Sequence, residues 1–587
     1  MKMRDSGPIL PSMTADQCGA QNSPESSLPW WFPYAVFAGI TLILAIPIIS
    51  NIDNWGVRDW DLFTTLHAAT VRSVVEYGQF PFWNPYIGGG NILFAHPEAA
   101  VLHPFFVILL LFGALIGLKL QLIIVYFIGM SGMYKLARQF SIGRFGSMTA
   151  SVAFMLSSFL TLHFAAGHIP FHYFALFPWL VFFYRKSLDR QLHILSAGAV
   201  TAFMILGSGA AVPMLFSLFF LLLISLLDSA VRKDWRPPLF AIAAGACGML
   251  FGAIKFFPMV DYFLRHPWIP EQFHDTTPLS LLPTMLFSFD QSLFAEYSRG
   301  YIWGWHEYGA FVGPVAMLLT VIGIVKGIKK GWPYVVLAGV SFLLVLGSFI
   351  PGWSPWDMLH RLPGFESIRV PSRFAILGLF GIAFLAGIGV DIVLSWLREQ
   401  SRWVGPGIVI VVLGTHLAVC LPILTEIFTR PPEEPIPHED FQQTVGDPNR
   451  MYWALLSNRG TIRSAWISGY HRLGRGILDQ NNQPSEWNST NGLVRVLGRE
   501  FTPNRIVYLL DTDVGGMLVV SQGYEAGWRR ADGGEIRPFQ DLVAFYVSPQ
   551  DSEVEIYYFP DYFIAGMITT LVSIGAAIFL ALRFRLR

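Results

Sequence analysis

Residues 374–394 read FAILGLFGIAFLAGIGVDIVL, an apolar run with a single charged side chain, Asp391. This length is enough for a transmembrane helix, which needs about 20 mostly apolar residues. Comparable runs recur along most of the chain, and the composition agrees with them, because 53% of the 587 residues are hydrophobic and only 14% are charged. The sequence therefore predicts an α-helical polytopic membrane protein whose surface mostly faces lipid.

About twelve such runs are expected to be transmembrane helices, although several are short for the purpose. The first is too long for a cleaved signal peptide, so we expect it to be retained. The twelve are residues 29–50, 118–136, 146–164, 171–184, 193–207, 212–227, 239–257, 310–325, 334–350, 374–394, 405–424 and 563–582.

The stretch 103–117 decides the topology, because it is apolar enough to be a further span or a helix lying in the membrane interface. If it does not cross, the short basic loops from Lys135 onward and the basic tail all lie on the side of Lys2 and Arg4. That arrangement agrees with the positive-inside rule, and a crossing would violate it. We therefore expect a plasma-membrane or inner-membrane protein with both termini in the cytoplasm.

This topology divides the chain into four parts. Residues 425–560 are polar and contain turn signals and short β-branched runs, which predict a small β-rich domain before the last helix. The expected parts are a polar cytoplasmic leader (1–28), a transmembrane domain (29–424) with extracytoplasmic loops at 51–117, 261–309 and 351–373, the extracytoplasmic β-rich domain (425–560), and the final helix with a basic tail (561–587).

The first long loop carries the strongest candidates for chemistry. Asp59 and Asp61 lie close to the first span, where partial desolvation can raise the basicity of a carboxylate, so that it acts as a general base or binds a metal. His96, Glu98 and His103 follow on the same loop and are candidates for substrate binding. An Asp-x-Asp pair is also common in ordinary loops and helix caps, and the spacing alone does not separate these interpretations.

Three cations are candidates for binding a lipid phosphate at the membrane boundary. Arg369 and Arg373 lie at the outer end of one predicted span, and one guanidinium group can bind two phosphate oxygens at once. Lys255 lies near the outer end of another; all three side chains could equally serve as interfacial anchors. Glu307 begins the span after the second long loop, where an acid either contacts substrate or complements the helix dipole.

Other signals exclude several classes of protein. The chain has no GxxxxGK, HExxH or GxSxG motif, and its three cysteines form no CxxC pair. A nucleotide-driven ATPase, a zincin and an ordinary serine hydrolase are therefore unsupported, and the net charge of zero gives no support for a nucleic-acid partner. His163, His168 and His172 stand close together, but their neighbours are mostly apolar, so we expect them to serve packing.

Four sequence features together resemble the YfhO-like membrane proteins, a branch of the GT-C glycosyltransferase superfamily. The resemblance extends over most of the chain. The resemblance rests on Asp59 with Asp61, the run GQFPFWNPY from Gly78 with the glycines after it, the segment from Leu362 to Arg373, and GYEAGW at residues 523–528.

The resemblance implies a GT-C-like enzyme that moves a sugar from a polyprenyl-phosphate-linked donor to a glycan, lipid or protein acceptor of the cell envelope. An acid of the first loop would be the catalytic base, and direct attack would invert the sugar carbon. Two acids stand where many relatives have one, which leaves the choice between Asp59 and Asp61 open. No cofactor is required, although Mg²⁺ or Mn²⁺ at the Asp pair is compatible with this chemistry.

Two non-enzymatic interpretations compete with this one. A carrier or flippase of lipid-linked sugars could use the same aromatic and cationic residues only to bind its ligand. Such a transporter usually places ionisable residues near mid-bilayer within an inverted repeat, and the sequence shows neither feature clearly. A scaffold subunit could use its β-rich domain to bind a partner.

Overall fold

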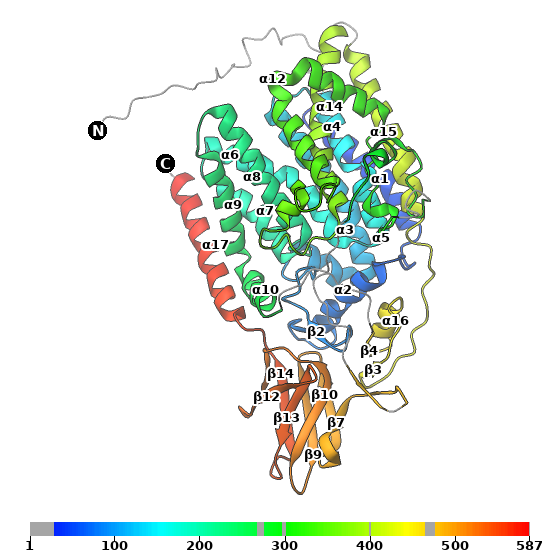
Figure 1. Ribbon diagram of the computed structural model, residues 1–587, viewed down its shortest axis with the longest axis vertical. Coiled ribbons are helices and arrows are strands. Elements are labelled where there is room, and N and C mark those ends of the chain that lie inside the picture. The colour runs from blue at the N-terminus through cyan, green and yellow to red at the C-terminus, as the bar shows by residue number, and fades with distance from the viewer. Residues whose placement is uncertain are drawn as a thin grey trace, which may run out of the picture.

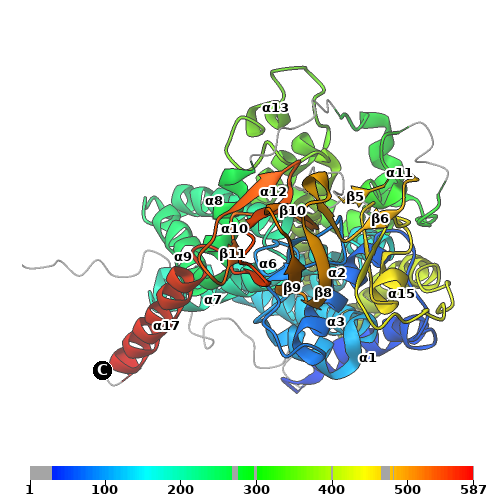
Figure 2. The same cartoon turned by 90° about the horizontal axis from the view of Figure 1, so that it is seen from below.

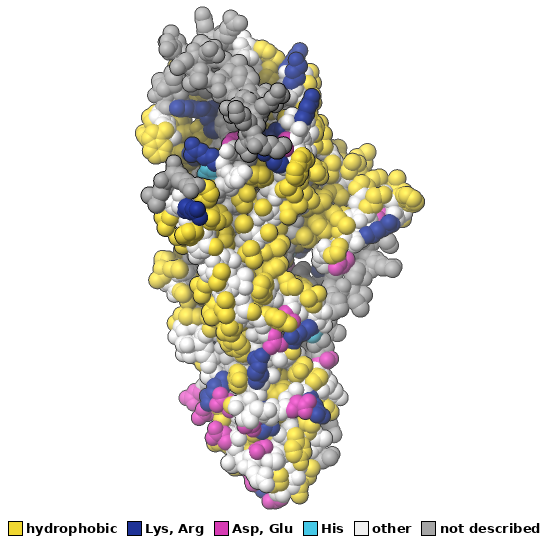
Figure 3. Space-filling view, turned by 90° about the vertical axis from the view of Figure 1, so that its left-hand side faces the viewer, with side chains coloured by type: hydrophobic (Ala, Val, Ile, Leu, Met, Phe, Trp, Pro, Cys, Tyr) yellow, Lys and Arg dark blue, Asp and Glu magenta, His cyan; other side chains and the backbone are white. Residues whose placement is uncertain are grey.

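The computed structural model describes residues 29–266, 275–295, 301–397, 401–463, 476–479 and 481–585. The predicted leader, 1–28, lies outside them. A tall helical bundle occupies the upper part of Figure 1 and a β-rich domain the lower part. In Figure 3, hydrophobic side chains cover much of the helical part of the visible face, while acidic and basic side chains mix over the lower domain.

Within the described residues, eight helices are long and apolar enough to cross a membrane, and the bent pair α9–α10 would make a ninth span. The chain is accordingly a multi-pass membrane protein. The main helices are α1 (Phe32–Ile49), α3 (Pro104–Gln139), α4 (Arg144–Met155), α5 (Ser158–Ala166), α6 (Phe177–Asp189), α7 (His193–Leu206), α8 (Val212–Arg232), α9 (Pro237–Phe251), α10 (Ala253–Arg265), α12 (Pro314–Val345), α14 (Ala375–Leu397), α15 (Ser401–Thr425) and α17 (Phe563–Arg585).

Shorter elements connect these helices at the end of the bundle nearest the β-rich domain. Those before the domain are α2 (Trp60–Val75), β1 (Trp83–Asn84), β2 (Asn91–Ile92), η2 (Ile169–Leu176), η3 (Leu279–Leu281), α11 (Leu282–Phe287), η5 (Trp305–Glu307), α13 (Pro355–Leu359) and η6 (Pro371–Phe374).

Helix α14, which contains the apolar run 374–394, lies at the centre of the bundle. Every residue from Ala375 to Val390 is buried. A Cβ on Gly389 would lie only 2.0 Å from the carbonyl oxygen of Leu319, so the lack of a side chain lets α14 and α12 approach at backbone distance. Packing between helices in a membrane depends on such close contacts.

Helix α12 reverses direction along its length. A Cβ on Gly331 would lie 3.8 Å from the carbonyl oxygen of Gly323, although eight residues of unbent helix span about 12 Å. Near its start Thr320 donates to Ile382 of α14 at 3.1 Å, and near its end Ser341 donates to Phe374 just before α14. The two limbs therefore both lie along α14, and they correspond to the predicted spans 310–325 and 334–350.

The stretch 103–117 folds back instead of continuing straight. Helix α3 breaks at Gly113, whose φ is +75°, and Gln121 beyond the break donates to the carbonyl of Phe105 at 3.2 Å. The arm Pro104–Phe112 is about 13 Å long at 1.5 Å per residue. Since the hydrocarbon core is about 30 Å thick, this arm cannot cross it.

The β-rich domain is a sandwich of two antiparallel four-stranded sheets, ordered β12-β13-β10-β7 and β11-β14-β9-β8. Aromatic side chains of facing strands meet between the sheets, with the rings of Tyr508 and Phe545 6.3 Å apart. Its strands are β7 (Trp487–Ser489), β8 (Arg495–Thr502), β9 (Arg505–Asp511), β10 (Gly516–Gly523), β11 (Trp528–Arg530), β12 (Ile536–Phe539), β13 (Leu542–Val547) and β14 (Glu553–Tyr558).

A short segment joins the bundle to this sandwich and packs beneath α2 (Figure 1). It contains β3 (Gln442–Thr444), α16 (Met451–Leu456), β4 (Arg459–Thr461), β5 (Ile477–Leu478), β6 (Pro484–Ser485) and η8 (Thr490–Gly492). Helix α17 then returns along the edge of the bundle, beside α9 and α10, and Figure 2 shows it at the margin in the view from below.

The loop after α2 is the docking surface for the sandwich. Trp83 donates from its indole nitrogen to Gln522 at 2.8 Å, and the amide of Gly523 donates to the carbonyl of Gly89 at 2.9 Å. The rings of Trp83 and Trp528 lie 5.1 Å apart, edge to face. The run that begins GQFPFWNPY and the run GYEAGW, far apart in sequence, therefore form one interface.

We expect Gly523→Ala to weaken this interface. The added Cβ would lie 2.6 Å from the carbonyl oxygen of Gly90, a backbone atom that cannot rotate away. Such overpacking costs about 1–3 kcal/mol, so thermal unfolding of the detergent-solubilised protein should shift to lower temperature.

Gly498→Ala, in β8 of the same sandwich, is the matched control. Its Cβ would make an ordinary contact with Leu509 at 3.4 Å, so its unfolding should stay close to that of the wild type. Equal stability of the two variants would contradict the tight contact between loop and sandwich.

Candidate functional site

Asp59 is held by its own backbone at the start of α2. Its amide donates to the carbonyl of Ala166 at the end of α5, at 3.0 Å, and the indole of the next residue, Trp60, donates to Phe164 at 2.8 Å. The chain fits this closely because the residue after α5 is Gly167, whose φ is +88° and whose Cβ would lie 2.2 Å from the Trp60 nitrogen. The loop and α5 thus fix the position of the Asp59 carboxylate.

A further anchor lies at the root of the loop. The Lys119 ammonium of α3 donates to the carbonyls of Asn51, Ile52 and Asn54 at 2.6–2.8 Å. The same ammonium lies 4.0 Å from the centre of the Phe428 ring. These contacts hold the segment between α1 and α2 against the bundle.

Asp59 faces a cavity of about 220 Å³. The side chain of Asp59 is 48% exposed, whereas most acids of this region are buried. Four segments line the cavity: the start of α2, the end of α5 with the turn after it, η5, and the stretch before α16. The cavity therefore lies between the helical bundle and the segment that leads to the sandwich. Its lining residues are Arg58, Asp59, Leu62, Ala166, His168, His306, Pro448 and Asn449.

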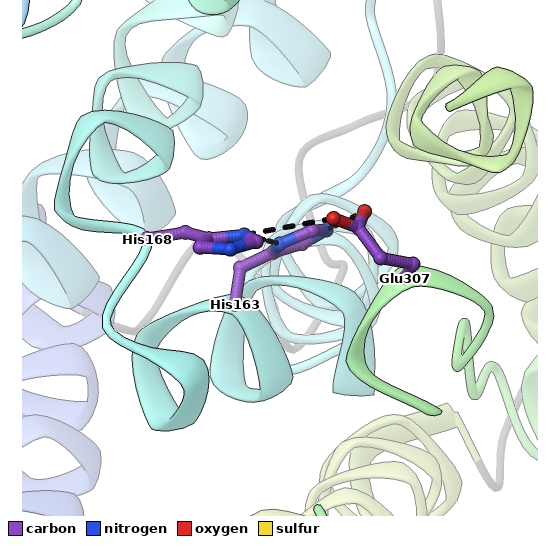
Figure 4. A group of neighbouring side chains, drawn as sticks. All are labelled: His163, His168 and Glu307. Atoms are coloured by element: carbon purple, nitrogen blue, oxygen red, sulfur yellow. Dashed lines mark hydrogen bonds and ion pairs between the residues drawn. The ribbon is translucent and has the colours of Figure 1, made fainter. Parts of the chain in front are cut away.

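Behind Asp59 a chain of polar side chains leads into the protein. The Nε2 atom of His168 lies 3.2 Å from the Asp59 carboxylate, and its Nδ1 lies 2.8 Å from Nδ1 of His163. Nε2 of His163 lies 3.9 Å from Glu307, which accepts a hydrogen bond on each oxygen from Arg373. Figure 4 shows both imidazoles beside the Glu307 carboxylate.

The protonation of these acids follows from their neighbours. Burial acts to raise the pKa of Asp59, but the hydrogen bond and charge of His168 bring it below its ordinary value. Burial likewise acts to raise the pKa of Glu307, and the charge and hydrogen bonds of Arg373 hold it well below its usual range. Both carboxylates are therefore ionised near neutral pH, as a general base must be.

Asp61 has a different role from Asp59. It is buried, and its carboxylate accepts hydrogen bonds from the amides of Met451 at 2.7 Å and Tyr452 at 3.2 Å, the first residues of α16. It therefore binds α2 to the segment below and does not line the cavity. Burial raises its pKa to about 6 despite these two bonds.

Glu98 and His96 are buried beneath the site. Burial raises the pKa of Glu98 to about 8, and the charges of Arg373 and Lys255 counter only part of that effect. Nδ1 of His96 accepts from the amide of Glu98 at 3.1 Å. Neither residue lines the cavity, so the structure places both in the support of the loop and not in contact with its contents.

Lys255 and His103 also form hydrogen bonds with backbone groups. The Lys255 ammonium is buried and donates to the carbonyls of Ala99 and Gly207, the latter at 2.7 Å. His103 caps α3 by accepting from the amide of Phe105 at 3.1 Å. Neither faces the cavity around Asp59.

The two arginines predicted to bind phosphate lie in different places. Arg373 is committed to Glu307, and its guanidinium lies 5.1 Å from the Phe171 ring. Arg369 lies against Trp303, 5.7 Å from its ring centre. The cation that lines the cavity is instead Arg58, next to Asp59 in sequence, and no salt bridge joins it to any residue that the structure describes.

The expectation that His163 and His168 serve only packing is wrong. His163 lies three residues before Ala166, which lines the cavity, and its Nδ1 lies 2.8 Å from Nδ1 of His168. His168 comes directly after Gly167, which turns the chain back toward Asp59. The nearness of the three histidines in sequence is the signal that could have revealed them. His172 does match the expectation, because its buried ring stacks on Tyr173 with centroids 4.2 Å apart.

No family model matches the sequence, and no curated protein does. Among solved structures, the chain is similar to the arabinofuranosyltransferase AftD from Mycobacteria, with 15% identity over 68% of this chain and a TM-score of 0.39. It spans 27% of the length of AftD. It is also similar to ArnT from Cupriavidus metallidurans bound to undecaprenyl phosphate, with 12% identity, 74% of this chain and 86% of that chain covered, and a TM-score of 0.43.

We expect Asp61→Ala to destabilise the protein. The substitution leaves two backbone amides at the start of α16 without their acceptor, at a cost of about 1–2 kcal/mol. Asp61→Asn keeps one acceptor oxygen and should cost less. Thermal unfolding of the two variants measures the difference, and wild-type stability of Asp61→Ala would contradict the capping role.

Glu98 should make stability depend on pH. Its folded pKa of about 8 lies above the ordinary 4.5, so its contribution to stability is complete below pH 4.5 and is lost as the pH rises to 8. Glu98→Gln keeps the shape but cannot ionise, so unfolding temperatures measured from pH 5 to pH 8.5 should fall less steeply in this variant. The wild type should lose up to about 1.4 kcal/mol more per pH unit than the variant. Parallel curves would show that Glu98 is ionised in the folded protein.

Proposed function

We propose that this protein is a membrane glycosyltransferase of the GT-C type, which moves a sugar from a polyprenyl-phosphate-linked donor to an acceptor at the extracytoplasmic face. Asp59 is the general base. The observation that carries the proposal is the position of Asp59: an ionised, half-exposed carboxylate in a cavity at one end of a helical membrane bundle.

The chemistry needs a base of this kind. A sugar hydroxyl is a poor nucleophile until a carboxylate takes its proton, and a hydrogen bond from an imidazole orients that carboxylate. His168 supplies the hydrogen bond to Asp59, and the second oxygen is left for the acceptor. Attack by the hydroxyl on the anomeric carbon, from the face opposite the departing phosphate, inverts that carbon.

The departing phosphate needs a cation, because negative charge grows on it as the sugar leaves. Arg58 lines the cavity beside Asp59, and its guanidinium rests 5.5 Å from the ring centre of Phe294. A guanidinium can bind two phosphate oxygens at once. We therefore assign the donor phosphate to Arg58 in preference to Arg373 and Lys255, whose hydrogen bonds are made within the protein; Arg369 remains a prediction.

The size of the cavity fits one sugar ring better than a larger ligand. Its volume of about 220 Å³ is below the ~300–1,000 Å³ typical of pockets for drug-sized molecules. The isoprenoid tail would lie outside the cavity, among apolar helix surfaces, where no nucleotide site or ATP is needed. The acceptor, a glycan, lipid or protein, would enter beside Pro448 and Asn449.

The orientation follows from charge. Lys330, between the two limbs of α12, donates to the carbonyl of Ser141 between α3 and α4. Figure 1 labels α12 at the end of the bundle far from the β-rich domain. Basic loops gather at that end, which we place in the cytoplasm together with both termini. In this orientation the chain would cross the membrane twelve times, twice through α12, and the cavity and the sandwich would lie on the extracytoplasmic side.

The decisive experiment compares two conservative substitutions two residues apart. Asp59→Asn should lower the rate of sugar transfer by at least about 100-fold, because the amide cannot accept the proton. Asp61→Asn should retain transfer within a few-fold. The assay supplies a panel of purified polyprenyl-phosphate sugars to membranes containing each variant.

Thermal unfolding confirms that both variants are folded before the rates are compared. Loss of transfer in Asp61→Asn alone would assign the role of base to Asp61 instead of Asp59. Full transfer in both variants, or donor binding without transfer in the wild type, would favour a carrier or a scaffold subunit instead.

A further inference from the structure

Three side chains behind Asp59 converge at a distance suited to a metal ion. His163 comes from α5, His168 from the turn after it, and Glu307 from η5, and one ligand atom of each lies within 4.8 Å of the other two (Figure 4). His163 and Glu307 are buried to 0% and 2% exposure. Three potential ligands from different segments thus meet inside the protein, beside the cavity.

One atom of this cluster lacks a hydrogen-bond partner. Nε2 of His163 is buried, and among the described residues no group lies within hydrogen-bond distance of it. It faces Glu307 at 3.9 Å, too far for a hydrogen bond. A buried imidazole nitrogen without a partner costs free energy, so a ligand that accepts its lone pair would be bound favourably.

The distances are close to those of a coordinated ion. Nε2 of His163 and Nδ1 of His168 each lie 3.9 Å from an oxygen of Glu307. Zinc binds nitrogen and oxygen at about 2.0–2.1 Å in a tetrahedron, which separates neighbouring ligand atoms by about 3.4 Å. Because the three ligand atoms lie within 4.8 Å of one another, a closure of at most about 1.4 Å would complete the geometry, with the present contact between His163 and His168 opening as the ion enters.

Two of these three residues contact a further charged side chain, as metal-binding residues commonly do. The opposite nitrogen of His168 lies 3.2 Å from the Asp59 carboxylate, which fixes the ring and leaves Nδ1 for an ion. Glu307 receives two hydrogen bonds from Arg373, one on each oxygen. A carboxylate has about four lone-pair positions, so two remain for a metal.

From these contacts we propose that His163, His168 and Glu307 bind a divalent transition-metal ion of the zinc type. Two imidazoles and one carboxylate suit zinc, whereas Mg²⁺ prefers oxygen ligands and usually keeps several waters. The site differs from the Asp59 and Asp61 pair, whose members point to different partners. Its existence does not depend on sugar transfer.

The test measures metal content directly. The full-length protein is purified in detergent with a tag that contains no histidine, incubated with Zn²⁺ and dialysed, and zinc is counted by mass spectrometry. We expect about one ion per chain in the wild type. His163→Gln and His168→Gln should bind zinc at least about 100-fold more weakly, because each substitution removes a direct ligand. Substitution of residues that only hydrogen-bond a ligand already lowers metal affinity by about 10–100-fold.

His172→Gln is the matched control, because His172 is a buried histidine that stacks on Tyr173 and is not one of the three clustered residues. It should keep the wild-type zinc content. Zinc should also raise the unfolding temperature of the wild type and of His172→Gln but not of His163→Gln.

Two results would overturn the proposal. Folded wild-type protein that retains no zinc after this treatment would show that the cluster is a hydrogen-bonded network only. Equal zinc content in the wild type and both ligand variants would place the ion elsewhere. Because no sugar is transferred in these measurements, either result leaves the transferase proposal standing or falling on its own assay.

Discussion

The hydrogen bond from the Asp59 amide to Ala166 joins the two parts on which the site depends, the first loop and the end of α5. It places the Asp59 carboxylate beside His168, because only Gly167 separates the acceptor from that histidine. The Trp60 indole makes a second bond to α5 two residues earlier, at the carbonyl of Phe164. Asp59, the proposed base, and His168 beside it are therefore positioned by backbone, with little dependence on flexible side chains.

Buried charge imposes the second constraint. Glu307 and Arg373 pair within the protein, and removing one partner of such a pair costs about 3–5 kcal/mol, because the other charge is left without compensation. Arg373 lies in η6, directly before the buried helix α14, and Glu307 lies in η5, before α12, which packs along α14. The pair thus ties the site to the core of the bundle, whereas Arg58 lines the cavity.

The sequence predicted the large features of the fold well and the site in part. Apolar runs of sufficient length identified the helices, and alternating β-branched runs such as Leu542–Val547 are strands. The sequence identified the acid pair of the first loop but not the different environments of its two members, which arise because residues two apart on a helix face different directions. Asp59 thus meets the cavity while Asp61 meets α16. The histidine cluster escaped because Glu307, distant in sequence, completes it.

The position of the sandwich explains why the site needs the end of the chain. Pro448 and Asn449, just before α16, line the cavity, and Asp61 holds α16 in place through two backbone amides. The sandwich that follows docks on the loop after α2, where Trp83 contacts Gln522 and Gly89 contacts Gly523. Since this loop leads back to Asp59 through α2, the sandwich braces the segment that carries Asp59. The cavity is therefore complete only when the last domain is folded against the first loop.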